Sequence, residues 1–343
     1  MTAMTAMTAL RRNLRYVLRS VGICLMFAFA IPASAGSDPL ASWNNTSPKT
    51  AILEFVRRVT AENSPDFVPV RERVAVFDDD GTLWVEHPYS AQLAFEFECA
   101  ANVLASDPDR SSKQPFKAAL DRDAEALAKL GQEGMAELLV ATHEGWSTSD
   151  YEAILSSWAT TTRDTRFKRL YTELTYKPMT ELIAYLRANG FQVYIVTSNS
   201  VEFVRFWAEG AFDLRPEQII GSSIATKFTM TNGRPELVRL PEISLVANGA
   251  GKPPAVYQRI GRRPIAVFGN SDADMEMFQW ATMAKGQHLG MLLHHTDAAR
   301  EFAYDREAEF GRLDNALSAA GGNGWVVIDM KNDWNEVFPS KAK

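Results

Sequence analysis

Three consecutive aspartates, Asp78, Asp79 and Asp80, directly follow the apolar run Val74–Phe77. Carboxylates crowded at the end of a buried strand repel one another and lose hydration unless a positive charge compensates them. A divalent cation is the natural compensation, and hard oxygen ligands suit Mg²⁺. Because side chains alternate along an extended segment, we expect Asp78 and Asp80 to face one site while Asp79 faces away. The triplet therefore predicts a magnesium site.

A second acidic group follows another apolar run, Pro264–Phe268. Asn270 and Asp274 offer further oxygen ligands for the same metal, and Asp272 is the alternative between them. If both runs are parallel strands of one sheet, their carboxyl ends lie at the same edge. We therefore expect Asn270 and Asp274 to share the metal with Asp78 and Asp80.

Phosphate-binding groups are also present in the sequence. Thr197 and Ser198 close the apolar run Val193–Val196, and a strand-to-helix turn there would present hydroxyl and backbone N–H donors to phosphate oxygens. Lys252 lies just before Pro253, at a predicted helix start, where its charge could neutralise phosphate and carboxylate groups. These residues favour chemistry on a phosphate group.

The elements that must position these residues alternate between apolar strands and helices. Helices are predicted over Thr50–Ala61 and Pro178–Asn189, the second ended by Gly190. Three more apolar runs could extend the sheet: Ile219–Ile220, Leu289–Leu293 and Trp325–Ile328. The alternation predicts an α/β fold with a doubly wound parallel sheet, in which ligands bind at the carboxyl ends of the strands.

The pattern changes between residues 88 and 177, where the apolar spacing is helical throughout. The predicted helices are Gln92–Ser106, Phe116–Leu130, Glu133–His143 and Ser149–Thr160. This stretch is too long for a loop, so we interpret residues 88–177 as an inserted helical cap domain. Residues 36–87 and 178–343 then form the catalytic core. His294 and His295 are expected to begin a helix with Thr296 and Asp297 rather than to bind zinc.

The first 35 residues have the pattern of a secretory signal peptide. Four arginines precede the apolar run Val21–Ile31, which is followed by Ala33-Ser34-Ala35. The apolar run is shorter than the roughly 20 residues that a bilayer span needs. We therefore expect cleavage after Ala35 and a periplasmic or secreted protein that meets the membrane only through this export signal.

Composition excludes some classes of function. The chain has a net charge of −6 and no basic block, so it is a poor candidate for nucleic-acid binding. Its two cysteines are Cys24 and Cys99, and removal of the leader would leave only Cys99. An intramolecular disulfide is then impossible in the mature protein.

Four segments, in order and with fitting spacing, resemble the motifs of the haloacid dehalogenase-like (HAD) superfamily. They are Phe77–Leu83, Val193–Thr197, Lys252 and Gly269–Asp274, and the resemblance spans nearly the whole mature chain. The helical insert is similar to the cap of the phosphoserine phosphatase-like branch.

The resemblance implies a role for each motif residue. Asp78 would be the nucleophile and a Mg²⁺ ligand, and Asp80 the general acid and base, with its backbone carbonyl on the metal. Thr197 and Lys252 would hold the transferring phosphoryl group. Asn270 is a departure, because family members often carry aspartate there, and a neutral ligand would weaken the metal site unless Asp274 or Asp272 supplies the charge.

The expected function is that of an exported, Mg²⁺-dependent phosphomonoesterase acting on a small-molecule phosphate ester through an aspartyl-phosphate. Two alternatives remain on the same fold: a dehalogenase, which Asp80 disfavours, and an exported binding protein that has lost catalysis. The sequence does not name the substrate or the oligomeric state. His87 is equally compatible with substrate contact and with a solvated loop, and the tryptophans Trp84, Trp146 and Trp158 are expected to serve packing.

Overall fold

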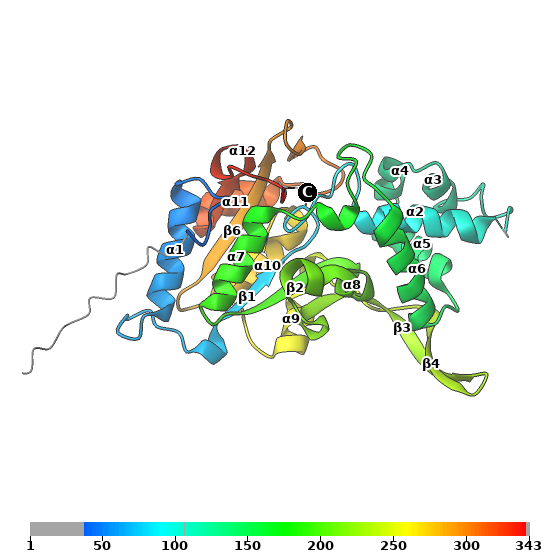
Figure 1. Ribbon diagram of the computed structural model, residues 1–343, viewed down its shortest axis with the longest axis horizontal. Helices are drawn as coiled ribbons and strands as arrows, with labels where there is room; N and C mark the ends of the chain where they lie inside the picture. The colour runs from blue at the N-terminus through cyan, green and yellow to red at the C-terminus, as the bar shows by residue number, and fades with distance from the viewer. Residues whose placement is uncertain (1–37, 106, 341–343) are drawn as a thin grey trace, which may run out of the picture. The chain divides into compact units, whose positions relative to one another are not determined.

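A computed structural model describes residues 38–105 and 107–340, and its central sheet contains all the predicted strands (Figure 1). Parallel pairing joins the strands in the order β3, β2, β1, β5, β6 and β8, while β4 and β7 pair antiparallel with β3 and β6. The bounds are β1 Val74–Phe77, β2 Gln192–Ser200, β3 Ile219–Thr231, β4 Arg234–Leu245, β5 Ala266–Gly269, β6 Leu289–Thr296, β7 Ala303–Tyr304 and β8 Val326–Asp329. The predicted α/β class with a doubly wound parallel sheet is confirmed.

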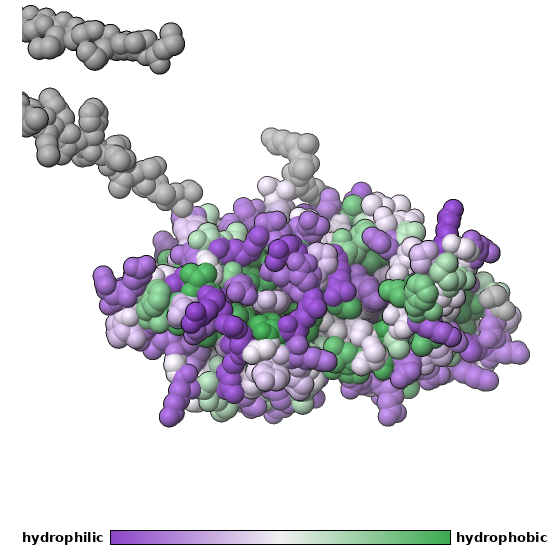
Figure 2. All heavy atoms as spheres, turned by 90° about the horizontal axis from the view of Figure 1, so that it is seen from below, coloured by the Kyte–Doolittle hydropathy of each residue, from purple (hydrophilic) through white to green (hydrophobic). Residues whose placement is uncertain are grey.

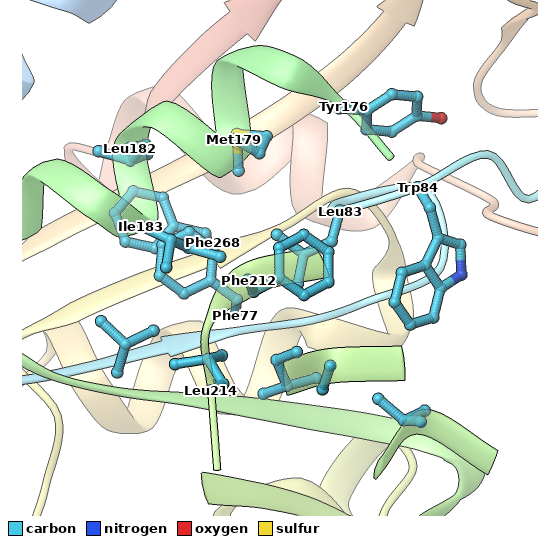
Figure 3. Packing of buried hydrophobic residues seen from close by; sticks show 14 of the residues in the cluster. Phe77, Leu83, Trp84, Tyr176, Met179, Leu182, Ile183, Phe212, Leu214 and Phe268 are labelled. Atoms are coloured by element: carbon cyan, nitrogen blue, oxygen red, sulfur yellow. The ribbon is translucent and has the colours of Figure 1, made fainter. Parts of the chain in front are cut away.

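Helices cover both faces of this sheet because its central strands are apolar on both sides. Ala75 and Phe77 of β1 belong to one buried cluster, and Val74 and Val76 belong to another. The first cluster includes α1 (Ser47–Thr60), α7 (Lys177–Ala188) and α8 (Val201–Phe212), and the second includes α9 (Lys252–Ile260), α10 (Met275–Thr282) and α11 (Asn315–Asn323). In the first cluster Phe77 stacks on Phe268 with 4.2 Å between ring centroids (Figure 3).

The order in which successive strands are added to the sheet reverses at β1, which lies between β2 and β5 and is parallel to both. Val76 pairs with Tyr194 of β2 on one side and with Val267 of β5 on the other. In an open α/β sheet, a ligand binds where the strand order reverses, outside the carboxyl ends of the strands. The aspartate triplet and Asn270 directly follow β1 and β5 at this position, and Thr197 lies in the last part of β2 beside them.

Residues 88–177 form helices α2 to α6, which lie together at one side of the sheet in Figure 1. Their bounds are α2 Ala91–Leu104, α3 Phe116–Leu120, α4 Ala124–Lys129, α5 Gly131–His143 and α6 Thr148–Thr161. The predicted helix Phe116–Leu130 is interrupted, because Arg122 has a φ of 53° and the Asp123 side chain caps α4. The domain boundaries at 88 and 177 stay a prediction.

Strands β3 and β4 form a long hairpin, of which only Ile219–Ile220 was predicted as a strand. It turns at Asn232-Gly233, both with positive φ, as a two-residue hairpin turn requires. Its outer part contacts the inserted helices through the backbone. Gly145 N donates to the Arg239 carbonyl at 3.1 Å, Arg239 N donates to the Trp146 carbonyl at 2.9 Å, and Ser147 pairs with Val238.

The expectation that His294 and His295 begin a helix is wrong. Both residues continue β6, where His294 pairs with Asp329 of β8 and His295 pairs with Tyr304 of β7. The strand extends this far because it has a partner on each side. His295 Nε2 lies 2.7 Å from the Gly81 carbonyl, so the strand end also contacts the aspartate loop.

No helix among the described residues is long and apolar enough to cross a membrane. The predicted signal peptide, residues 1–35, lies outside the described part of the chain. On the face shown in Figure 2, hydrophilic side chains cover most of the area and hydrophobic ones form smaller groups between them.

Candidate active site

The Asp78 carboxylate lies at the end of β1 in contact with Lys252. Lys252 Nζ, at the first turn of α9, is 2.5 Å from Asp78 Oδ1 and 2.6 Å from Asp274 Oδ1. Lys252 is only 1% exposed, so this charge is nearly dehydrated. Burial by itself would lower the pKa of Lys252, but the charges of Asp274 and Asp78 outweigh burial and raise the pKa. The structure thus brings residues of three motifs together as a buried carboxylate–ammonium–carboxylate group.

Asp80 is held by two side-chain donors. Trp84 Nε1 donates to Asp80 Oδ1 at 2.6 Å, and Asn199 Nδ2 donates to Asp80 Oδ2 at 3.0 Å. Burial raises the pKa of Asp80 well above its ordinary value, and the charges of Asp79 and Glu86 add to this. A raised pKa favours the protonated carboxyl, which can donate a proton to a leaving group.

Asp79 faces away from the cavity that Asp78 and Asp80 line. It is 1% exposed, and its carboxylate accepts from Asn199 Nδ2 at 3.1 Å and hydrogen-bonds the Thr197 hydroxyl. The alternation expected from strand geometry is therefore present in the structure. Asn199 joins Asp79 and Asp80, which fixes the relative orientation of the two carboxylates.

Thr197 and Ser198 have different surroundings at the end of β2. Ser198 is exposed and lines the cavity, whereas Thr197 is completely buried and does not. The Thr197 hydroxyl accepts from Asn199 N at 2.8 Å. Ser198 is thus the better placed of the two for a ligand, and Thr197 orders the turn beneath it.

Asn270 lies behind the aspartate loop, in contact with Thr82 and Glu86. The Thr82 hydroxyl donates to Asn270 Oδ1 at 3.1 Å and to Asp78 Oδ2 at 3.3 Å, while Asn270 Nδ2 donates to Glu86 Oε1 at 2.6 Å. Tyr304 OH donates to the same Glu86 oxygen at 2.7 Å. Glu86 is thus a fourth carboxylate of the site beside Asp78, Asp80 and Asp274.

Asp272 and Asp274, the two aspartates of Gly269–Asp274, both accept hydrogen bonds from the protein. Asp274 Oδ2 accepts from the backbone N–H groups of Asn270 and Ser271 at 3.0 and 3.1 Å. Because Asp274 Oδ1 contacts Lys252, both oxygens of this carboxylate are occupied by the protein. Asp272 accepts from the backbone N–H groups at the start of α11 and does not line the cavity. A direct bond from Asp274 to a metal stays a prediction.

A cavity of about 380 Å³ opens on these residues. It is bounded by the strand ends, by α2, α4 and α5 of the insert, and by the β3–β4 hairpin. Lys252 is the single lysine or arginine among the described residues lining it, against five carboxylates: Asp78, Asp80, Glu86, Glu96 and Glu309. Those of the carboxylates that are ionised would repel a phosphate group, and additional positive charge would offset this repulsion.

The donor set at the strand ends fits Mg²⁺. Burial and the charge of Asp274 raise the pKa of Asp78 although Lys252 lowers it, and burial raises the pKa of Glu86 although His295 lowers it. A hard cation would stabilise the ionised carboxylates. Asp78 Oδ2 and Asn270 Oδ1 both accept from Thr82, so two oxygens from different motifs lie close together. Oxygen atoms are the ligands that Mg²⁺ requires.

At the inner wall of the cavity, Glu96 of α2 is buried beside the end of α5. Glu96 Oε2 accepts from the Thr142 hydroxyl at 2.9 Å and lies 3.3 Å from His143 Nε2. The Arg239 guanidinium lies over the Tyr151 ring at 3.8 Å and acts on the charge of Glu96. Burial raises the pKa of Glu96 to about 8 and lowers the pKa of His143 to about 3.

We expect Glu96→Gln to stabilise the protein above pH 8 and to flatten its pH dependence. In the folded state Glu96 binds its proton up to about pH 8, whereas its ordinary pKa is 4.5. Its contribution to stability is therefore complete below pH 4.5 and is lost as the pH rises to about 8, by as much as about 5 kcal/mol. Urea unfolding at pH 5 and 8.5 measures this, with the exposed Glu133→Gln as control. Equal pH slopes for wild type and Glu96→Gln would contradict it.

Three residues that act at the site were missed or given another role from the sequence. Glu86 was missed, although a lone acidic residue directly after Leu83–Val85 is a signal that could have found it. Trp84 was assigned to packing and also donates to Asp80. Arg239 gave no signal, because its hairpin was not predicted. His87 Nε2 lies 3.1 Å from the Phe310 carbonyl, and His87 does not line the cavity.

Comparison with solved structures gives distant similarities of fold. A protein of unknown function from Bordetella pertussis Tohama I is 17% identical, over 76% of this chain and 99% of that one, with a TM-score of 0.47. A functionally unknown protein from Anaerococcus prevotii is 14% identical, over 72% and 85%, also at 0.47. A probable phosphoserine phosphatase from Vibrio cholerae is 17% identical, over 76% and 68%, at 0.38.

No curated protein sequence matches the chain. The model of the haloacid dehalogenase-like hydrolases matches residues 75–279, from β1 through the triplet, Lys252 and Asn270 to α10. The match covers more than half of the chain and contains all four motifs that carry the resemblance. The protein therefore belongs to the haloacid dehalogenase-like hydrolase family.

Proposed function

We propose that the protein is an exported, Mg²⁺-dependent phosphomonoesterase that uses Asp78 as its nucleophile. The observation that carries this proposal is the contact of Lys252 with Asp78 beside Asp80, all three on the wall of one cavity. A nucleophile, a cation for phosphate and a proton donor are the parts that phosphoester cleavage needs. Family membership supports hydrolysis as the reaction class.

In the first step an oxygen of Asp78 attacks phosphorus and the bond from phosphorus to the ester oxygen breaks. Lys252 neutralises charge on the phosphoryl oxygens, and Ser198 offers a donor to them. Asp80, oriented by Trp84 and Asn199, gives its proton to the departing alcohol. In the second step ionised Asp80 takes a proton from water, the water oxygen attacks phosphorus, and phosphate leaves with Asp78 restored.

The residues that would hold Mg²⁺ are Asp78, the Asp80 backbone carbonyl and Asn270, with Asp274 predicted as a further ligand or as a support through Lys252. When bound, Mg²⁺ supplies positive charge that lets the anionic nucleophile approach an anionic phosphate. Without Mg²⁺, Lys252 would be the one lysine or arginine beside several carboxylates on the part of the cavity wall that the structure describes, and these carboxylates would repel a bound phosphate.

The substrate that we propose is a small-molecule phosphate ester, because the cavity is bounded on several sides and its volume is about 380 Å³. The acidic wall and the net charge of −6 do not suit nucleic acid.

Export remains a proposal that is based on the sequence pattern from Arg11 to Ala35. N-terminal sequencing of the mature protein should give Gly36 as the first residue. A mature protein that begins near Met1 would contradict export.

The experiment that tests the proposed function is hydrolysis of a chromogenic phosphomonoester with and without metal. We expect turnover with Mg²⁺, loss of turnover in EDTA, and recovery when Mg²⁺ is added in excess, because the carboxylates would otherwise repel the phosphate. Full activity in chelator would contradict the metal requirement. Absence of turnover with Mg²⁺ across several phosphate esters would favour a binding protein that has lost catalysis.

A further inference from the structure

Glu86 is a buried carboxylate without a cation of its own among the described residues. It is 6% exposed, and its two side-chain donors, Asn270 and Tyr304, are neutral. The charge of His295, which lies 3.1 Å from Glu301, lowers the pKa of Glu86, but the effect of burial is larger and the pKa stays raised. Burying an ionised carboxylate is unfavourable unless a positive charge compensates it. A cation at the metal site would therefore stabilise the ionised form of Glu86 beyond what these neighbours provide.

The backbone around Glu86 makes room for this carboxylate. Gly81 and Gly311 both have positive φ, at 71° and 63°. A Cβ on Gly81 would lie 2.2 Å from Glu86 Oε1, and a Cβ on Gly311 would lie 2.0 Å from the same atom. No larger residue fits either position while Glu86 keeps its place. Two separate loops are thus shaped around one carboxylate oxygen.

Glu86 also determines which atom Asn270 presents to the metal site. An ionised carboxylate accepts hydrogen bonds and cannot donate them, so the amide nitrogen of Asn270 must face Glu86. The amide oxygen then faces Thr82, whose hydroxyl also contacts Asp78. Without Glu86 the two ends of the amide could exchange, and a donor rather than an acceptor would face the metal.

We propose that Glu86 is a positioning residue for the metal: it turns Asn270 Oδ1 toward Mg²⁺ and supplies the negative charge that a neutral asparagine ligand lacks. This inference rests on the proposed function, because it concerns the same metal. Glu86 and Asn270 act as one unit across a hydrogen bond of 2.6 Å. Together they provide the oxygen and the charge that a single aspartate would provide.

The test is the affinity for Mg²⁺, measured by isothermal titration calorimetry on the purified full chain. We expect Glu86→Gln to weaken Mg²⁺ binding about 10- to 100-fold, as for other supports of metal ligands. Adding Asn270→Asp to Glu86→Gln should restore affinity to within about threefold of wild type. In that double variant the amide and the carboxylate exchange places across the same hydrogen bond, and the site regains its charge.

The control is Glu309→Gln, which removes another carboxylate from the cavity wall without touching Asn270. Its Mg²⁺ affinity should change less than twofold. Thermal melting of each variant without metal verifies folding. Wild-type affinity in Glu86→Gln, or a double variant no better than Glu86→Gln, would overturn the inference. Absence of Mg²⁺ binding by the wild-type protein would instead overturn the proposed function.

Discussion

Asp78→Asn is expected to remove nearly all turnover, while Asp79→Asn should stay within about tenfold of wild type. An amide cannot serve as the nucleophile, so the first of these losses is complete. Asp79 faces away from the cavity and holds Asn199 and Thr197, and an asparagine there can still accept a hydrogen bond. Asp80→Asn should lose proton transfer, at a cost of roughly 10²–10⁴-fold, and accumulate phosphoenzyme.

The three variants form a matched set, because each replaces a carboxylate by an amide of the same size. One assay with a chromogenic phosphomonoester measures turnover, and acid-quenched protein shows whether phosphate stays attached. The fold should tolerate all three changes, since each removes one of several buried like charges. If Asp79→Asn is the inactive variant and Asp78→Asn is active, the assignment of the site is wrong.

Lys252→Met is expected to lower kcat/KM by about two to four powers of ten, on the order of 3–5 kcal/mol of transition-state stabilisation. Lys252 is the one lysine or arginine among the described residues of the cavity wall, so no neighbour can replace it. Arg262 and Arg263, two further cations near Lys252 in sequence, are exposed, and Arg262 donates to the Arg71 carbonyl instead. A near-wild-type rate would contradict the role of Lys252.

The same substitution should also destabilise the fold, because Asp78 and Asp274 would then face each other unpaired. Breaking a buried ion pair in this way costs about 3–5 kcal/mol. Adding Asp274→Asn to Lys252→Met separates the two effects: it should recover much of the stability in urea unfolding and none of the activity. Recovery of both would mean that Lys252 serves the fold alone.

Much of this site follows from sequence because parallel strands carry their last residues to one edge. Ile195, Phe77 and Phe268 are in register across β2, β1 and β5, so the residues just after them lie close together. Glu86 could not be placed in this way, since it lies in a loop whose path depends on Gly81, Gly311 and Tyr304. A contact of 2.6 Å between residues 184 positions apart has no local pattern in the sequence.

The hairpin and His295 were missed for a different physical reason. Most residues of β3 beyond Ile224 are exposed or half-exposed, so the strand lacks the apolar signal of β1. His295 was expected in a helix because the prediction used only the neighbouring residues in the sequence. The strands that pair with β6 cannot be read from those neighbours. Its strand continues because β7 and β8 flank it, and those pairings join segments from elsewhere in the chain.

Backbone hydrogen bonds connect the β3–β4 hairpin, which lines one side of the cavity, to the inserted segment that lines another side. Ser222 of β3 and Ile243 of β4 line the cavity, and further along, Arg239 exchanges hydrogen bonds with Gly145 and Trp146 of the insert. Helices α5 and α6 cannot swing away from the strand ends unless the hairpin bends with them or these bonds break. The stiffness of a two-stranded ribbon, and not only the packing of helices, thus limits how large a molecule can enter.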